Sequence, residues 1–222
     1  MARLSYPAPG QPRPAALPPE RRTVGQLVAE SIHAYGDRFL PSLALGVGPA
    51  LIAVGTAHVS RTTWLILAPT VVAAILSVSF TAAAVLVLKR RPPWRRLVVA
   101  WAFGWLVIAP LPFLVLAFVL PGLAWLAAVG LVVPVLVVED VAPRAALPRA
   151  WRLARADYVH ALGSLATLAI VVFLTQAVLA FLLRGVGGAA VWAAYVLANM
   201  VVSPLLFLGT ALLYVDQSAR VK

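Results

Sequence analysis

The chain of 222 residues contains no cysteine and few charged residues. Without cysteine, disulfides, thiol nucleophiles and thiolate metal sites are excluded. Charged residues make up 11% of the sequence, whereas a soluble domain usually contains about 25%. Residues 97–138 form a stretch of 42 positions without Asp, Glu, Lys, Arg or His. A soluble core cannot hold a helix that is apolar on every face over such a length, so the sequence predicts an integral membrane protein.

The first 22 residues lack the apolar run of about 7–15 residues that a secretory signal peptide requires. They contain six prolines instead. Proline-rich polar sequence favours extended, unpacked conformations. We therefore predict a disordered cytoplasmic tail over residues 1–22 and ordered structure from Thr23 onward.

Apolar segments alternate with short basic segments over residues 23–222, which predicts an all-α membrane protein. We place six transmembrane helices, arranged as three hairpins, at about 40–59, 64–88, 97–120, 123–138, 158–183 and 189–215. A single helix over residues 97–138 would be roughly 63 Å long, about twice the hydrocarbon thickness. A turn at Pro121-Gly122 leaves two pieces near spanning length, so we predict the turn there and a kink at Pro110 and Pro112.

Two amphipathic helices are predicted at the cytoplasmic membrane surface, over residues 24–39 and about 143–157. Thr23 followed three residues later by Gln26 indicates a capping box at the start of the first. In the second, Trp151 is expected on the apolar side, while Arg149, Arg152 and Arg155 occupy the polar side.

The basic residues give the topology. With the N-terminus inside, 16 of the 18 Lys and Arg residues fall in cytoplasmic segments, as the positive-inside rule requires. We therefore expect both termini in the cytoplasm. The formal charge of +11 is explained by this topology and by attraction to anionic lipid headgroups, and not by nucleic-acid binding.

Three short motifs resemble those of a bacterial family. They are Pro134-Val135-Leu136-Val137-Val138-Glu139, then Ala146-Leu147-Pro148-Arg149-Ala150-Trp151-Arg152-Leu153, and finally Leu212-Leu213-Tyr214-Val215-Asp216. The chain is similar here to uncharacterised six-helix membrane proteins related to the membrane domain of glycerophosphoryl diester phosphodiesterases. The motif positions are Glu139, Trp151, Tyr214 and Asp216.

The resemblance implies a bacterial cytoplasmic (inner) membrane location. It implies no phosphodiesterase activity, since that belongs to a separate soluble barrel for which this chain has no room. The chain departs from the family at Pro148 and Ala150, where the family has Arg and Ser, and at Ser218, where it has Arg. A phosphate or headgroup site that uses those side chains is therefore not expected here.

The sequence provides no catalytic cluster. The three histidines, His33, His58 and His160, are spread over different segments, and the acidic residues all fall in segments assigned to the cytoplasm. We therefore expect no enzyme activity, no metal and no cofactor. Stripes of small residues, such as Ala73, Ser77 and Thr81, predict close helix contacts within the bundle or between protomers.

Five residues remain as candidate contacts. Arg149, Arg152 and Arg155 are expected to bind anionic lipid headgroups. Gln176 and Asn199 lie in adjacent antiparallel spans at similar depth, so we expect both to point into the bundle and a contact between them to be feasible. The leading hypothesis is a non-enzymatic scaffold or regulatory bundle at the cytoplasmic face that binds membrane lipid and a protein partner or a second copy. The alternative is a passive transporter or lipid-handling protein with a path between the third, fifth and sixth spans.

Overall fold

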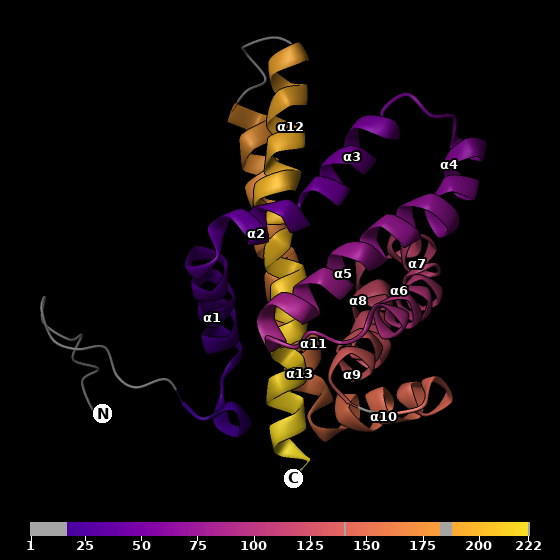
Figure 1. The fold of residues 1–222 in the computed structure, drawn as a ribbon. Coiled ribbons are helices and arrows are strands. Elements are labelled where there is room, and N and C mark those ends of the chain that lie inside the picture. The colour runs from indigo at the N-terminus through magenta and orange to yellow at the C-terminus, as the bar shows by residue number, and fades with distance from the viewer. Residues whose placement is uncertain (1–16, 140, 183–187, 222) are drawn as a thin grey trace, which may run out of the picture.

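The computed structural model describes residues 17–139, 141–182 and 188–221, and this part of the chain is helical and contains no strand. In chain order its elements are η1 (Pro19–Arg21), α1 (Val24–Asp37), α2 (Phe39–Leu45), α3 (Val47–Gly55), α4 (Arg61–Leu67), the π-helical turn η2 (Ala68–Val72), α5 (Ala73–Leu88), α6 (Trp94–Ile108), α7 (Leu111–Ala117), α8 (Val119–Val129), α9 (Val132–Val138), α10 (Pro143–Ala156), α11 (Tyr158–Leu182), α12 (Gly188–Val202) and α13 (Pro204–Arg220) (Figure 1).

Within the described ranges, five helical stretches are long and apolar enough to cross a membrane. They are Arg61–Leu88, Trp94–Val115, Val119–Val138, Tyr158–Leu179 and Val191–Arg220. A sixth arises if the pair Val24–Asp37 and Phe39–Gly55, bent by 110°, is one broken span. A helix satisfies its own backbone hydrogen bonds, which is why apolar sequence of this length folds this way in lipid. The predicted all-α class is confirmed, and five or six apolar helices fit the predicted multi-pass membrane protein.

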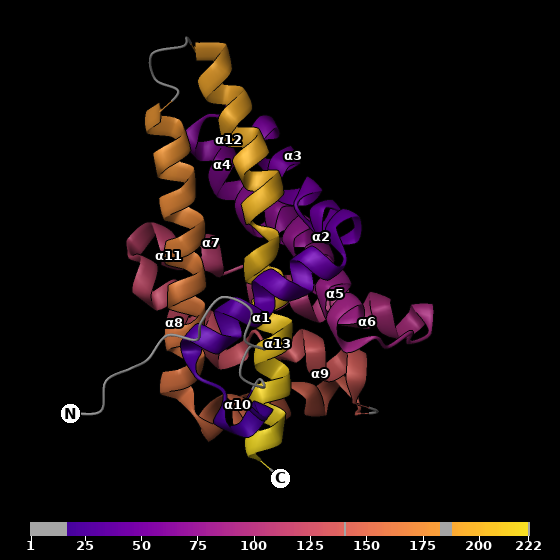
Figure 2. The same ribbon diagram turned by 90° about the vertical axis from the view of Figure 1, so that its left-hand side faces the viewer.

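In the N-terminal region, regular structure begins before Thr23, and the first long helix packs against other helices of the bundle. The 3₁₀ turn η1 precedes Thr23 and packs against α13. The capping box is confirmed, since Gln26 N donates to the Thr23 hydroxyl and Thr23 N donates to the Gln26 side chain. Helix α1 then lies along α13 and α11, with Leu27 and Ser31 buried (Figure 2). The prolines at positions 1–16 lie outside the described residues.

The turn between the third and fourth spans is at Phe118 and not at Pro121-Gly122. Phe118 is extended (φ −161°, ψ 148°) and separates α7 from α8. Pro121 falls in the first turn of α8, where a helix tolerates proline because that N–H has no partner in any case. Gly122 faces α7, where an added Cβ would lie 2.5 Å from a Val115 methyl group. The dipeptide therefore starts a helix and permits close packing. A break between α6 and α7, next to Pro110, is present as expected.

Helix α13 is the centre of the bundle and contacts α1, α5 and α11. Together with α12 it forms a long rod (Figures 1 and 2), while α6 and α9 pack against α5 and α8 packs against α11. The small residues Ala73, Ser77 and Thr81 are buried, and the Ser77 hydroxyl donates to Trp101 O at 2.6 Å. This stripe therefore packs α5 against α6 within one bundle.

Candidate functional site

Buried ionic groups gather at the end of the molecule formed by η1, the start of α11 and the end of α13, which we name the basal network. Asp216 on α13 is fully buried, and its Oδ1 accepts from Arg22 Nη1 at 2.6 Å. Its second oxygen, Oδ2, lies 3.5 Å from His160 Nε2. Neither of these two atoms has a hydrogen-bond partner within the described part of the chain. Asp216 thus joins three segments that are distant in sequence.

Asp157 supplies the other carboxylate of the basal network. It precedes α11, and its Oδ1 accepts the backbone N–H of His160 at 2.9 Å, as a capping residue does. Arg220 donates to Asp157 Oδ2 and, at 3.1 Å, to the carbonyl oxygen of Arg22. Gln217 Nε2 donates to the carbonyl oxygen of Asp157 at 2.9 Å. Two arginines therefore offset two carboxylates, of which Asp216 is fully buried and Asp157 is half-buried. Such pairing compensates for the loss of water around a buried charge.

A second polar contact joins α9, α10 and α13. Glu139 accepts from Arg149 Nε, at 3.2 Å on Oε1 and 3.0 Å on Oε2. The Tyr214 hydroxyl donates to Glu139 Oε1 at 3.1 Å. Three of the four motif positions therefore lie in polar contacts: Glu139 and Tyr214 with each other, and Asp216 in the basal network. Arg149 is occupied by a carboxylate instead of being turned to solvent.

The remaining candidates on α10 lie on its outer surface. Helix α10 buries Ala146, Ala150, Leu153 and Ala154 against the bundle. Trp151 is 40% exposed, and the guanidinium of Arg155 stacks on its ring at 4.8 Å. Arg152 is exposed as well. The apolar side of α10 is therefore divided between alanines that face the protein and an outward face that carries Leu147 and Trp151.

Gln176 and Asn199 are brought together across the α11–α12 pair. Gln176 Nε2 donates to Asn199 Oδ1 at 3.3 Å, and Asn199 Nδ2 donates to the Tyr195 carbonyl oxygen at 2.8 Å. Both side chains are half-buried. These contacts occupy one proton of the Gln176 amide, and no side chain or backbone group of the described residues donates to its oxygen.

The two amides line a cavity of about 380 Å³, which we name the amide cavity. It lies between α3, α5, α11 and the α12–α13 rod, and Leu111 is its one lining residue from the third span. Phe80 and Phe207, packed edge to face at 4.8 Å, form part of its wall. Its lining is largely apolar, with a few polar groups from Thr56, Gln176, Tyr195, Asn199 and Ser203. This composition is typical of sites that bind small apolar or amphipathic molecules.

The basal network was not anticipated from the sequence. Asp216 was placed in a solvated segment, yet it continues an apolar helix and must find a partner once it is buried. That isolated carboxylate was the available signal, as was the position of Asp157 directly before a helix. Its partner Arg22 carried no signal, because it follows a proline-rich segment. Within the described ranges, no three His, Cys, Asp or Glu side chains lie close enough to hold a metal ion.

Comparison of the chain with protein-family models, with curated proteins and with solved structures gives no significant match. The resemblance to the six-helix family therefore stays a prediction based on the three motifs.

Proposed function

We propose that this chain is a non-enzymatic bacterial inner-membrane protein that accommodates a lipid or another amphipathic molecule in the amide cavity. Both termini are assigned to the cytoplasm, because that orientation places 16 of the 18 basic residues inside. The observation that supports the function is the amide cavity itself. Its volume of about 380 Å³ falls in the range of roughly 300–1,000 Å³ that is usual for ligand sites.

The lining favours an amphipathic occupant over a polar solute. Most of the wall is aliphatic or aromatic, so the occupant gains by burying apolar surface. The free oxygen of Gln176 accepts a hydrogen bond from a hydroxyl or amide, which sets the position of one polar group. A path for ions requires more polar groups to replace their water. The lipid-handling alternative is therefore supported more strongly than passive transport of a polar solute.

Photo-crosslinking tests this proposal. The purified protein is placed in phosphatidylcholine vesicles with a diazirine on one acyl chain, and labelled peptides are identified by mass spectrometry. We expect labelling of Ala53 and its neighbours on α3 and of the Tyr195–Ser203 region. Ala53→Phe, which fills the cavity, is expected to reduce that labelling severalfold, whereas Ala177→Phe on an exposed position of α11 leaves it unchanged.

The amides have their own matched pair of variants. Gln176→Leu with Asn199→Leu is expected to fold, because hydrogen bonds between membrane helices contribute only about 0.6–2 kcal/mol. Labelling should nevertheless decrease, since the occupant loses its polar anchor. Thr175→Val removes a hydroxyl that bonds only within α11 and should leave labelling intact. Equal labelling of all variants would show that lipid contacts the outer surface alone.

A scaffold at the cytoplasmic face is the second candidate, and the outward face of α10 supports it. Leu147 and Trp151 are 44% and 40% exposed, and both lie beside exposed arginines. A surface of this kind fits a membrane surface or an acidic protein partner. Loss of cellular activity in Leu147→Ser with Trp151→Ser, together with intact labelling of the amide cavity, would favour this function over the first.

A further inference from the structure

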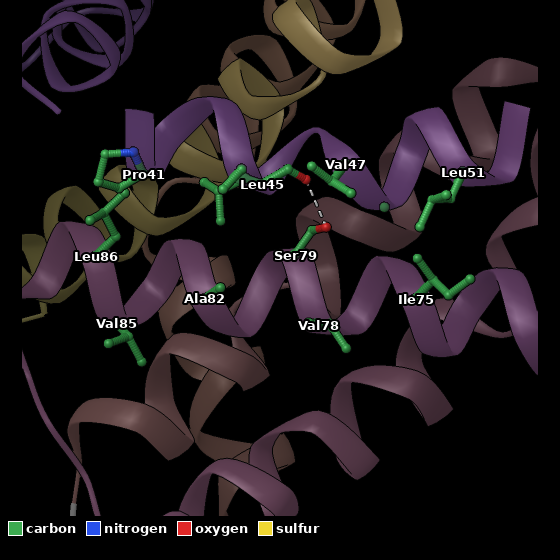
Figure 3. A pocket seen from close by; sticks show the side chains of 12 residues that line it. Pro41, Leu45, Val47, Leu51, Ile75, Val78, Ser79, Ala82, Val85 and Leu86 are labelled. Atoms are coloured by element: carbon green, nitrogen blue, oxygen red, sulfur yellow. Dashed lines mark hydrogen bonds between the residues drawn. The ribbon is translucent and has the colours of Figure 1, made fainter. Parts of the chain in front are cut away.

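A second hollow runs along the opposite side of α2 and α3, and we name it the lateral groove. It has a volume of about 590 Å³ and lies between α2–α3 and α5. Figure 3 shows Pro41 and Leu86 at one end of it and Leu51 and Ile75 at the other. Its polar side chain, Ser79, donates to the Leu45 carbonyl oxygen at 2.9 Å and is thereby occupied. The groove therefore presents an apolar surface.

A basic pocket of about 310 Å³ lies next to the end of the groove at Leu86. Val85 and Leu86 line both hollows, so the two adjoin. The pocket also contains Arg38, Lys89, Arg90 and Arg91. Arg38 Nη1 donates to the Leu86 carbonyl oxygen at 2.8 Å, which offsets the partial negative charge at the end of α5.

The other three cations of the pocket are free to bind an anion. Lys89, Arg90 and Arg91 are exposed, and none of them is within ion-pair distance of a carboxylate in the described segments. A small neighbouring hollow contains Asp37 beside Arg38 and Lys89. One carboxylate against four cations leaves the pocket with an excess of positive charge.

The length of the groove matches one leaflet. From Ile75 to Leu86 it follows eleven residues of α5, or about 16 Å, while half of the hydrocarbon core is about 15 Å. Helix α5 runs obliquely through the bundle (Figure 1), so the groove extends over less than this length along the axis of the bundle. Its apolar part thus lies at the depth of acyl chains, and its basic pocket at the depth of headgroups of the same leaflet.

We infer that the lateral groove binds an anionic phospholipid, with an acyl chain between α2–α3 and α5 and the phosphate at Arg38, Lys89, Arg90 and Arg91. Charge complementarity selects this occupant, because a neutral lipid gains nothing from the cations and a soluble protein cannot reach the apolar part. The groove shares no lining residue with the amide cavity. The site therefore goes beyond the proposed function, and either one stands if the other fails.

The test measures which lipid the whole protein retains. The protein is purified from vesicles of equal parts phosphatidylcholine and phosphatidylglycerol, and bound lipids are counted by native mass spectrometry. We expect the wild type to retain phosphatidylglycerol preferentially. Lys89→Gln with Arg90→Gln and Arg91→Gln should reduce that preference about tenfold or more, because each cation near the headgroups favours an anionic lipid. The milder double variant Arg90→Gln with Arg91→Gln keeps three nearby cations, which preserve the orientation of the chain during membrane insertion. It should reduce the preference for phosphatidylglycerol to an intermediate degree.

The apolar part is tested separately. Ala44→Phe places a ring in the groove and should reduce retention of both lipids, whereas Ala193→Phe, on an exposed position of α12, should change neither. Neutralising Arg21, Arg61 and Arg144 to Gln is the charge-matched control, because these exposed residues line neither hollow, and it should retain the preference. An unchanged lipid ratio in the loop variants, or unchanged retention in Ala44→Phe, would overturn the inference even if the amide cavity is labelled as proposed.

Discussion

Arg22 Nη1 lies 2.6 Å from Asp216 Oδ1, although the two residues are 194 positions apart in the chain. Their side chains are 11% and 0% exposed. The pair fastens the segment before the first long helix to the last turns of the central helix. The carbonyl oxygen of Arg22 accepts from Arg220 at the same place. The first and last described segments are therefore held by one set of contacts.

Arg22→Ala should lower the free energy of unfolding by about 3–5 kcal/mol, because it leaves the Asp216 carboxylate buried without its cation. Denaturant titration in detergent measures this change. Arg21→Ala is the matched control, since Arg21 is exposed, and it should change stability little. The double variant Arg22→Met with Asp216→Leu should recover most of the loss. Equal stability of the two single variants would show that the pair contributes nothing.

Gly46→Ala should destabilise the bundle by about 1–3 kcal/mol or more. A methyl group at Gly46 would overlap the carbonyl oxygen of Met200 on α12, and a backbone atom cannot move aside as a side chain can. Gly55→Ala, at the end of α3, has open space around the new methyl group and should be neutral. Thermal unfolding of both variants gives the comparison. Identical melting temperatures would mean that α12 does not approach the α2–α3 junction so closely.

Tyr214→Phe should lower the free energy of unfolding by about 1.5–3 kcal/mol, the range for a hydrogen bond to a charged group. The lost bond is the one that the Tyr214 hydroxyl donates to Glu139. Tyr195→Phe is the control, because Tyr195 is 42% exposed, and water replaces its hydroxyl contacts. The same titration as for Arg22 measures the difference, which should decrease to about 0.5–1.5 kcal/mol when Glu139 is already replaced by Gln, because the uncharged amide oxygen still accepts the bond.

Reporter fusions test the orientation. Fusions after Pro93, Arg155 and Lys222 should all report the cytoplasm, because those segments contain the basic residues. A fusion after Ser60 should report the opposite side. The model with six spans and both termini inside fails if any of the first three reports the periplasm.

The helical class and the approximate positions of the spans follow from composition, because charge-free sequence of spanning length has one stable backbone solution in lipid. The distances of Gln176 and Asn199 along their helices from the turn that joins them were likewise enough to predict that the two residues lie at similar depth. Depth along a helix depends only on local helix geometry. The bend at Arg38 and the turn at Phe118 could not be found in this way. An extended Phe118 needs no special residue type, and Pro121 was interpreted as a stop although proline is equally suited to a first helical turn.

Contacts between distant segments lie beyond such local patterns. Nothing around Arg22 distinguishes it from Arg21, yet one is buried against Asp216 and the other is exposed. The difference arises only when α13 is placed beside η1. The hollows have the same origin, because their shapes depend on how far α3 stands from α5 and α11.

The separation of Arg22 from Asp216 also has a consequence for synthesis. At about 5–20 residues per second, the ribosome needs roughly 10–40 s between these two residues. During that time Arg22 has no carboxylate at position 216 to bind, and the face of α1 around Leu27 and Ser31 has no central helix to cover it. The first segment can therefore pack in its final position only after the last helix has been inserted. A chain that stops before α13 exposes an unpaired arginine and an uncovered helix face, and incomplete chains that expose such surface are prone to aggregation.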